Sequence, residues 1–238
     1  MSKQSKKSSV PTPTASDHQG PLARPQTAFD RVTKVFQMES GRDKICRFIQ
    51  YFFMFLSPVL KDLGLVEVAT QLDIIRFAMS SARMAMRFEK PYSLLKRISI
   101  RHSSDQPVHF QDHDPLAALR TLSDLTLFFF FLSDHPLFFY KLGYLPMSLG
   151  SLQGLDYWNN IFWLGNSVQE IAIGLIEVLR MKVKESKAGK FVYILQNASD
   201  LPIEFFYLNW YPETCGPHLA GLCGAACSVS SLLQMWKA

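Results

Sequence analysis

Residues 66–90 of this 238-residue chain read VEVATQLDIIRFAMSSARMAMRFEK, a stretch with the pattern of an amphipathic helix. At about 100° per residue, its four cations fall in one narrow arc and its apolar residues cover the opposite side. The cations are Arg76, Arg83, Arg87 and Lys90, and the apolar side carries Ile74, Ile75, Ala78, Ala82, Ala85 and Met86. This pattern is typical of a helix in a lipid headgroup layer. It also fits a surface helix on a basic soluble domain.

The composition favours shallow or partial embedding in a membrane. Hydrophobic residues make up 48% of the chain, with 19 Phe, and charged residues make up 19%. Soluble domains carry about 25% charged residues, so this chain is poor in charge. The mean hydropathy of +0.05 is high for a soluble protein and modest for a protein with many membrane spans.

The net charge of +5 is unevenly distributed along the chain. Residues 1–111 carry 17 Lys or Arg and 9 Asp or Glu, whereas residues 112–238 carry 8 and 11. A basic half can meet anionic lipid or nucleic acid. Nucleic acid is disfavoured, because the cations are interleaved with long apolar faces and form no polar patch with exposed stacking aromatics.

The chain is expected to form one all-α, membrane-associated helical domain after a disordered tail. Residues 1–27 are rich in Lys, Ser and Pro and bury too little apolar surface to offset the entropy of ordering. The domain, residues 28–238, divides into a basic amphipathic half (28–101), a polar loop (102–115) and a hydrophobic half (116–238).

Local signals set the expected ends of the first helices. A first helix is expected over residues 29–38, and Ser40 with Asp43 resembles an N-cap that opens a second helix. The amphipathic stretch 66–90 is expected to end at Pro91, because proline cannot continue a helix.

The C-terminal segment is the expected membrane span. Residues 214–236 contain no Asp, Glu, Lys or Arg, and a span needs about 20 such residues. Ala220, Gly224 and Ser228 are small residues at four-residue spacing, which allows close helix approach and self-association. A buried helix in a soluble bundle is the alternative, although Gly221 and Gly224 would weaken it there.

The sequence contains no pattern that indicates catalysis, a metal or a cofactor. It has no phosphate loop, nucleophile elbow, HExxH or dinucleotide fingerprint. The loop 102–115 holds three His and three Asp, but solvated loop residues rarely converge on one ion. The four cysteines are interpreted as packing residues in a reducing compartment; they are Cys46, Cys215, Cys223 and Cys227. No catalytic residue is assigned, and we expect no enzyme.

Five motifs in order give the chain a family resemblance. They are GRDKICRFIQY (41–51), SSARMAMRFEKP (80–91), SDHPLFFYKLGYL (133–145), DYWNNIFWLGN (156–166) and GLCGAACSVSSLLQMW (221–236). From about Phe29 to its C-terminus the chain resembles the peroxisomal-membrane peroxin-11 family, which elongates and proliferates peroxisomes, or glycosomes in kinetoplastids. The resemblance implies a non-enzymatic protein of the peroxisomal or glycosomal membrane that remodels and elongates this membrane before fission.

The resemblance also assigns residues and partners. In the family the amphipathic helix binds and remodels anionic membrane lipid. By position, the lipid-facing cations become Arg76, Arg83, Arg87 and Lys90, and the inserting face becomes Ile75, Met79, Ala82 and Met86. The implied partners are other copies of the chain as a homo-oligomer, the peroxisomal fission machinery and the receptor that imports peroxisomal membrane proteins.

Two other function classes stay open. A peroxisomal membrane channel for small metabolites is the alternative, with charged residues of the apolar half lining the pathway. Those residues are Arg120, Asp124, Lys141, Glu170 and Glu177. An adaptor that acts through the tail or the basic helix is the third class. The face that contains Ala78, Ala82 and Ala85 could also pack against another helix rather than lipid.

Overall fold

The structure, a computed structural model, describes residues 27–102, 115–181, 187–211 and 214–237. The described residues form nine α-helices and no strand, which confirms the expected all-α fold. The expected disordered tail lies almost wholly outside the described residues, as does the polar loop between residues 103 and 114. Their predicted character therefore stays a prediction.

Helix α1 (Ala28–Gln37) begins at a capping box. The Thr27 hydroxyl accepts a hydrogen bond from the Asp30 amide at 3.2 Å, and the Asp30 carboxylate accepts one from the Thr27 amide at 2.8 Å. Two amides that lack partners at a helix start are satisfied in this way. Helix α1 therefore starts one residue before its expected position.

Helix α2 (Glu39–Asp62) follows α1 almost without a linker. Its N-cap is Met38, whose side chain makes no capping hydrogen bond, so the expected cap at Ser40 is wrong. The chain turns so tightly that a Cβ atom at Gly41 would lie 2.0 Å from the carbonyl oxygen of Val35. The glycine is required there by close approach of α1 to α2.

A turn at Gly64, which has a φ of +79°, leads into α3 (Val66–Met86). The expected single helix over residues 66–90 is shorter than predicted. Proline 91 lies in the first turn of α4 (Lys90–His102), where its missing N–H costs nothing, and so it opens α4 instead of ending α3. The last cation of the basic stripe therefore belongs to α4.

Helices α5 (Pro115–Lys141) and α6 (Leu149–Arg180) form a long packed pair. A short turn separates them, in which Gly143 has a φ of +77° and Ser148 caps α6 by accepting from the Ser151 amide. These two helices contain most of the described residues between 115 and 180, which is the first part of the expected hydrophobic half.

The C-terminal part contains α7 (Ala188–Ala198), α8 (Leu201–Tyr207) and α9 (Pro217–Lys237). Helix α9 runs along α2, and the two form the most extensive helix contact of the described chain. Their contact holds a core of fully or almost fully buried residues to which α8 adds Ile203; the other members are Tyr51, Met54, Ala220 and Ala225.

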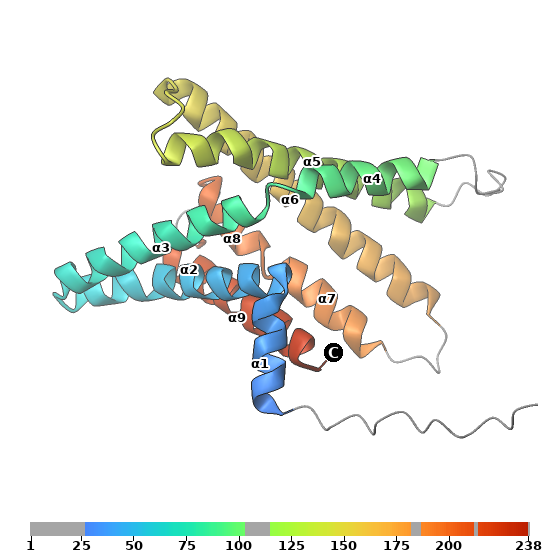
Figure 1. Ribbon diagram of the computed structural model, residues 1–238, viewed down its shortest axis with the longest axis horizontal. Helices are drawn as coiled ribbons and strands as arrows, with labels where there is room; N and C mark the ends of the chain where they lie inside the picture. Colours follow the sequence, from blue (N-terminus) through green and yellow to red (C-terminus); the bar gives the residue numbers. More distant parts are fainter. Residues whose placement is uncertain (1–26, 103–114, 182–186, 212–213, 238) are drawn as a thin grey trace, which may run out of the picture.

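The helices fall into two groups in Figure 1. Helices α1, α2, α3, α8 and α9 pack together, and α4, α5, α6 and α7 form the second group. The groups touch where α3 meets α5, where α6 meets α8 and where α7 meets α9. A polar cavity lies at this boundary and is described below.

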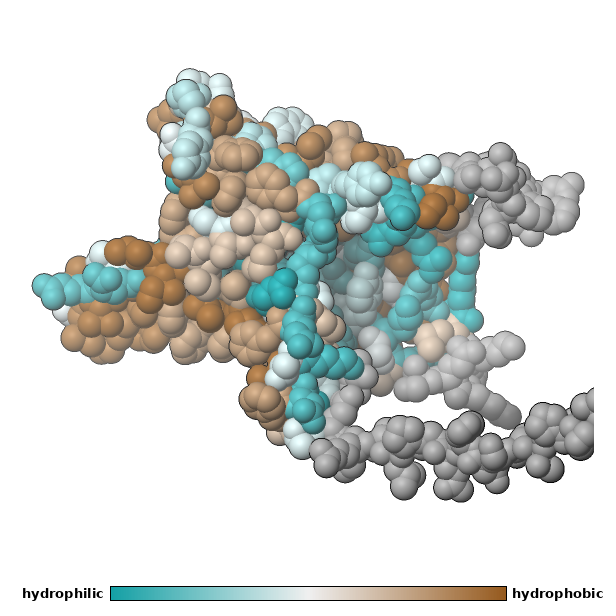
Figure 2. Space-filling view, viewed as in Figure 1, coloured by the Kyte–Doolittle hydropathy of each residue, from teal (hydrophilic) through white to brown (hydrophobic). Residues whose placement is uncertain are grey.

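Three of the described helices are long and apolar enough to cross a membrane: α5, α6 and the 20-residue segment Pro217–Trp236 of α9. The expected C-terminal segment is thus a candidate span, and α5 and α6 are two further candidates. Less than half of each candidate span is buried inside the protein. Figure 2 shows large apolar areas on the surface, including the end of the α2–α3 hairpin.

Candidate functional site

One face of α2 carries a row of polar side chains that point into the protein. Asp43, Arg47, Gln50 and Tyr51 recur at intervals of three or four residues, which places them on one side of the helix. Arg47, Gln50 and Tyr51 are buried. Because a buried charge is costly unless it is paired, this face requires partners on the helices packed against it.

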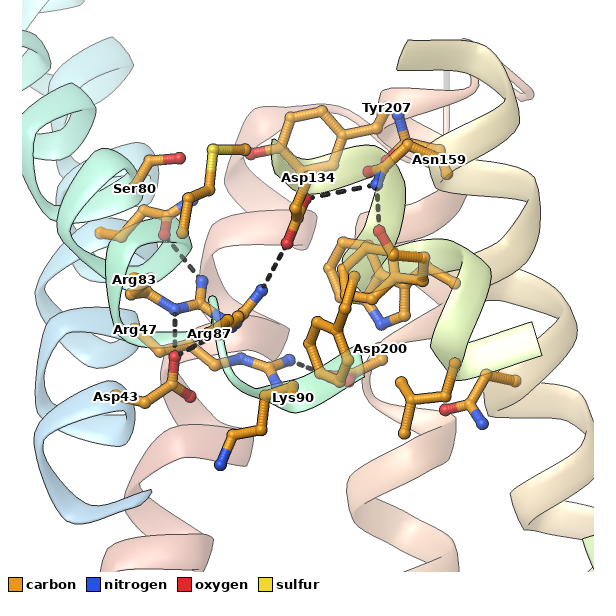
Figure 3. A pocket seen from close by; sticks show the side chains of 18 of the residues that line it. Asp43, Arg47, Ser80, Arg83, Arg87, Lys90, Asp134, Asn159, Asp200 and Tyr207 are labelled. Atoms are coloured by element: carbon orange, nitrogen blue, oxygen red, sulfur yellow. Dashed lines mark hydrogen bonds and ion pairs between the residues drawn. The ribbon is translucent and has the colours of Figure 1, made fainter. Parts of the chain in front are cut away.

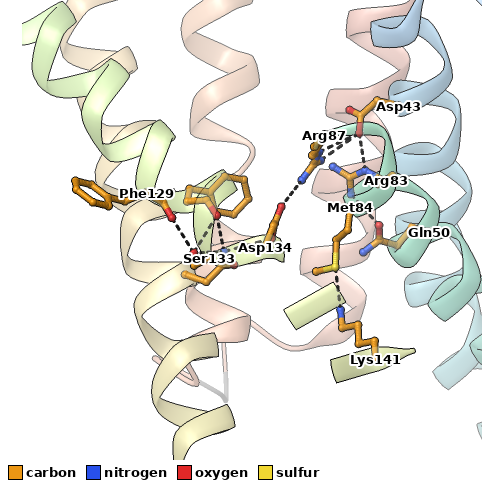
Figure 4. A network of polar contacts seen from close by, with 11 residues as sticks. Asp43, Gln50, Arg83, Met84, Arg87, Phe129, Ser133, Asp134 and Lys141 are labelled. Carbon is orange, nitrogen blue, oxygen red and sulfur yellow. Dashed lines mark hydrogen bonds and ion pairs between the residues drawn. The ribbon is translucent and has the colours of Figure 1, made fainter. Parts of the chain in front are cut away.

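The basic stripe of α3 supplies two of these partners. The Nε atom of Arg83 donates to Oδ1 of Asp43 at 3.1 Å, and its Nη1 atom donates to Oε1 of Gln50 at 2.7 Å. One turn further on, at the C-cap of α3, Nη2 of Arg87 donates to the same oxygen of Asp43 at 3.2 Å. Two guanidinium groups thus converge on one carboxylate, as Figure 4 shows.

The two arginines keep Asp43 ionised. Burial raises the pKa of Asp43, but the charges of Arg83 and then Arg87 outweigh burial and hold this pKa well below the usual carboxyl range. A general acid or base works best with a pKa near the operating pH. Asp43 therefore organises the two arginines and is not suited to proton transfer.

Arg87 also connects α3 to α5. Its Nη1 atom lies 3.4 Å from Oδ2 of Asp134. Asn159 of α6 donates to Oδ1 of the same carboxylate at 3.2 Å and to the carbonyl of Phe130 at 2.9 Å. One continuous set of polar contacts therefore joins α2, α3, α5 and α6 across the boundary between the two helix groups.

A second buried ion pair joins Arg47 of α2 to Asp200, which precedes α8. The guanidinium carbon of Arg47 lies 5.5 Å from the centre of the Tyr51 ring and 5.9 Å from that of Trp163. Aromatic faces attract cations at such distances. The Nε atom of Arg47 is buried and has no hydrogen-bond partner among the described residues.

These side chains surround a cavity of about 350 Å³, which we call the central cavity. The cations that line it are Lys44, Arg47, Arg83, Arg87, Lys90 and Lys141, and the acids are Glu39, Asp43, Asp134, Asp156 and Asp200. Aromatic residues form much of the remaining wall; they are Tyr51, Phe130, Phe131, Trp163 and Tyr207. Figure 3 shows Arg47, Arg83 and Arg87 gathered on one side. Such a mixed lining suits a small ligand with a polar and an apolar part.

The structure corrects the expected orientation of the basic stripe. Arg83 is only 6% exposed, and the side chain of Arg87 is mostly buried. Both face the interior, because they pair with Asp43 of α2 rather than with groups outside the protein. In this structure these two arginines are not lipid-facing.

The other two cations of the stripe lie nearer the surface. Nζ of Lys90 pairs with Oε1 of Glu39 at 2.8 Å, and Nη2 of Arg76 lies 3.5 Å from Oδ1 of Asp73. About a third of each cationic side chain is exposed. Arg76 and Lys90 therefore retain a surface position, whereas the two cations between them do not.

The side of α3 that faces away from α2 is apolar. Ile74 is 57% exposed, Ile75 is 40% exposed and Phe77 is 50% exposed. The other expected inserting residues, Met79, Ala82 and Met86, are half-buried at the edge of this surface. Helix α3 thus turns its cations inward and several of its apolar side chains outward.

The small residues of α9 face α2 of the same chain, so the close helix approach expected from them is made within the monomer. Ala220 and Ser228 are completely buried. A Cβ atom at Gly224 would lie 2.3 Å from Cγ of Tyr51, so only glycine allows this helix approach. The surface of Ala220, Gly224 and Ser228 is therefore occupied within the monomer.

The charged residues of the apolar half gather in a second cavity of about 270 Å³ between α4, α5, α6 and α7. Of the five expected pathway residues, Arg120, Asp124, Glu170 and Glu177 line it, whereas Lys141 lines the central cavity. Their partners are close: Arg120 and Lys190 pair with Glu177, Arg97 and Arg101 pair with Asp124, and Tyr193 donates to Glu170.

Several residues of the central cavity were not expected from the sequence. Asp43 was interpreted as part of a helix cap, and Asp134, Asn159 and Asp200 received no role. Charged or amide side chains inside apolar segments are the signal that points to such residues. Among the described residues, no group of three or more His, Cys, Asp or Glu is placed to hold a metal ion. The His- and Asp-containing loop lies outside the described part.

Comparison with known proteins gives one match. A family model described as peroxisomal biogenesis factor 11 (PEX11) matches residues 29–191, which is more than half of the chain. This range contains α1 to α6 and the start of α7, and with them most of the central cavity. No curated protein and no solved structure matches the chain.

Proposed function

Because this chain belongs to the peroxisomal biogenesis factor 11 family, we propose that it elongates the peroxisomal membrane by inserting the apolar face of α3. The family consists of non-enzymatic proteins of the peroxisomal membrane that act in peroxisome proliferation and membrane elongation. The proposal concerns the route by which this chain elongates the membrane, and it rests on the outward apolar face of α3.

Apolar contact is the larger contribution to such insertion. Fully burying one Ile or Phe side chain is worth about 1.5–3 kcal/mol. Ile74, Ile75 and Phe77 are each at least 40% exposed, so all three have area to bury. A cation near an anionic membrane surface contributes about 1 kcal/mol. Arg76 and Lys90 are the two of the four cations with surface positions, so apolar insertion outweighs the cationic contribution.

Insertion beside membrane-spanning helices provides a way to bend a membrane. The candidate spans α5, α6 and α9 would hold α3 at the membrane. A helix that lies in one leaflet adds area to that leaflet alone, which favours curvature. One copy adds little area, so we propose that many copies act together as a homo-oligomer. We also infer contact with the fission machinery and the membrane-protein import receptor, which the family resemblance implies.

The test compares peroxisome length in cells that lack the native protein. The variant I74S/I75S replaces two exposed apolar side chains of α3, and the control variant I74L/I75L keeps their hydrophobicity. We expect I74S/I75S to reach peroxisomes but to leave them short, and I74L/I75L to elongate them as the native chain does. Normal elongation by I74S/I75S would contradict insertion of α3.

A channel for small metabolites is the second candidate. The observation that favours it is the gathering of Arg120, Asp124, Glu170 and Glu177 in one cavity between α5 and α6. Charged residues inside apolar membrane helices commonly mark a solute or ion pathway.

Conductance of the protein in planar bilayers tests this candidate. The variant R120Q/E177Q neutralises one ion pair of the second cavity and preserves net charge. The matched control K61Q/D73N neutralises the Lys61–Asp73 pair, at 2.9 Å on the α2–α3 hairpin. A channel predicts conductance whose ion selectivity changes in R120Q/E177Q alone. Absence of conductance, or equal effects of both variants, would contradict it.

A further inference from the structure

Three cations that line the central cavity keep N–H donors without an oxygen acceptor in the described part of the chain. The half-buried Lys44 makes no ion pair there, and Nε of Arg47 is buried without a partner. The Nζ atom of Lys141 lies 3.7 Å from Sδ of Met84 and 5.9 Å from the centre of the Phe77 ring. The carboxylates of Asp134 and Asp156 attract this ammonium electrostatically, but neither forms an ion pair with it in the described part of the chain.

The cations of the central cavity differ in their pairing. Arg83, Arg87 and Lys90 each pair with a carboxylate. Arg47 pairs with Asp200 through Nη2, so only its Nε atom is spare. Polar groups that are buried in proteins nearly always have a partner. The spare donors therefore indicate a ligand that brings its own acceptors.

We propose that the central cavity binds the phosphate group of a phosphate-bearing ligand through Lys44, Arg47 and Lys141. Phosphate carries several acceptor oxygens and a negative charge, which matches donors that approach from α2 and from α5. Burial, followed by the charge of Arg47, lowers the pKa of Lys44 to about 8, and an anion beside Lys44 would favour its charged form.

The remaining wall of the central cavity indicates what is attached to the phosphate. Tyr51, Phe130, Phe131 and Trp163 provide aromatic surface beside the cations, and Figure 3 shows the cations and the acids from several helices converging on the same space. A cavity of about 350 Å³ has room for a headgroup or a small phosphate ester. The source of the phosphate is either a membrane phospholipid or a soluble phosphate ester.

This inference is independent of membrane insertion by α3. The side chains of Ile74 and Ile75 are exposed on α3 and do not line the central cavity. We therefore expect I74S/I75S to bind phosphate probes as the native chain does. Loss of elongation with retained binding would contradict neither proposal, and each can fail without the other.

The experiment measures binding to the purified full chain in a maltoside detergent that contains no phosphate. Glycerol 3-phosphate is the soluble probe, and dihexanoyl phosphatidic acid is the lipid probe. The variant K44Q/K141Q removes two spare cations of the central cavity. The control K61Q/K190Q makes the same change of charge outside it, and K44R/K141R restores charged donors. Titration calorimetry gives the dissociation constants.

We expect K44Q/K141Q to bind about tenfold or more weakly, because hydrogen bonds to charged groups are the strong ones. K61Q/K190Q and K44R/K141R should bind like the native chain. Binding of both probes supports a soluble phosphate ester, and binding of phosphatidic acid alone supports a membrane phospholipid. Absence of binding to the native chain, or equal weakening by K61Q/K190Q, would overturn the proposal.

A second measurement uses the native chain, so the conclusion does not depend on the folding of K44Q/K141Q. Reductive methylation of lysines is mapped by mass spectrometry with and without each probe. We expect the binding probe to protect Lys44 and Lys141 and to leave Lys61 unaffected. Equal methylation of all three lysines with and without both probes would overturn the proposal.

Discussion

Asp43 is the carboxylate with which both Arg83 and Arg87 form ion pairs. These pairs join the N-terminal part of α2 to the C-terminal end of α3. Since burial of a charge is tolerated only with a partner, the burial of each of these three side chains depends on the other two. The stripe of cations that resembles a lipid-binding surface in the sequence is in part an internal ion-pair network.

Replacement of Asp43 by Asn should therefore destabilise the protein. We expect D43N to lower the free energy of unfolding by about 2–4 kcal/mol, because two mostly buried guanidinium groups lose their carboxylate. Chemical unfolding in detergent measures this change. The exposed D62N at the end of α2 is the control, and equal effects of D43N and D62N would contradict the network.

The contribution of Asp43 also has a pH dependence. Since its folded-state pKa is lower than its unfolded-state pKa, its stabilisation is present above the unfolded-state pKa of about 4. The stabilisation is lost as the pH falls through the folded-state pKa. D43N should lack this component, so its stability should fall less steeply in acid than that of the native chain.

Glu204 gives folding stability the opposite dependence on pH. Oε1 of this fully buried carboxyl accepts a hydrogen bond from the Ser167 hydroxyl, and burial raises the pKa of Glu204 to about 8. Because the folded-state pKa is raised, the stabilisation is complete below the unfolded-state pKa and is lost as the pH rises from there to about 8. We expect thermal unfolding of the native chain, compared with E204Q, to become relatively easier as the pH rises from about 5 to about 8. A constant difference between the two would contradict a neutral Glu204.

At the scale of the helix, the contact between α2 and α9 depends on glycine. A Cβ atom at Gly224 would lie 2.3 Å from the Tyr51 ring, whereas one at Gly154 of α6 meets nothing within 4 Å. We expect G224A to lower the free energy of unfolding by about 1–3 kcal/mol, because the added methyl group overpacks a tight contact. G154A should leave it unchanged or slightly raised. Equal stability of G224A and the native chain would contradict the packing of α9 on α2.

Helix α3 and Pro91 show which structural features local sequence patterns can predict and which they cannot. The pattern of residues 66–90 predicts a helix with two unlike faces, and α3 has them. The direction of each face could not be predicted, because it depends on Asp43, which lies more than thirty residues away in the sequence. Proline 91 illustrates a second limit: the same residue can end one helix or occupy the first turn of the next.

At the scale of the molecule, two groups of helices meet at the polar central cavity. The Arg87–Asp134 pair joins the groups where α3 meets α5. An all-α membrane protein of this family could be predicted from composition and motif order. The central cavity could not, because its walls come from residues between 39 and 207 that only the fold brings together.

The link between the two groups can be weakened without a change of net charge. We expect R87Q/D134N to speed amide hydrogen exchange in the C-terminal halves of α3 and α5, because the ion pair that links them is lost. The control K61Q/D73N removes a pair inside the α2–α3 hairpin and should leave α5 unchanged. Unchanged exchange in R87Q/D134N would contradict a role of this pair in joining the groups.

The measurement that tests the central claim most directly asks which side of α3 contacts lipid. A diazirine amino acid is placed at Ile74, which is 57% exposed, or at Ser80, which lines the central cavity. The full chain is then illuminated in liposomes that contain anionic lipid. Insertion of the apolar face predicts phospholipid adducts at position 74 and few at position 80. Adducts at position 80 alone, or at neither position, would contradict the insertion of α3 into the membrane.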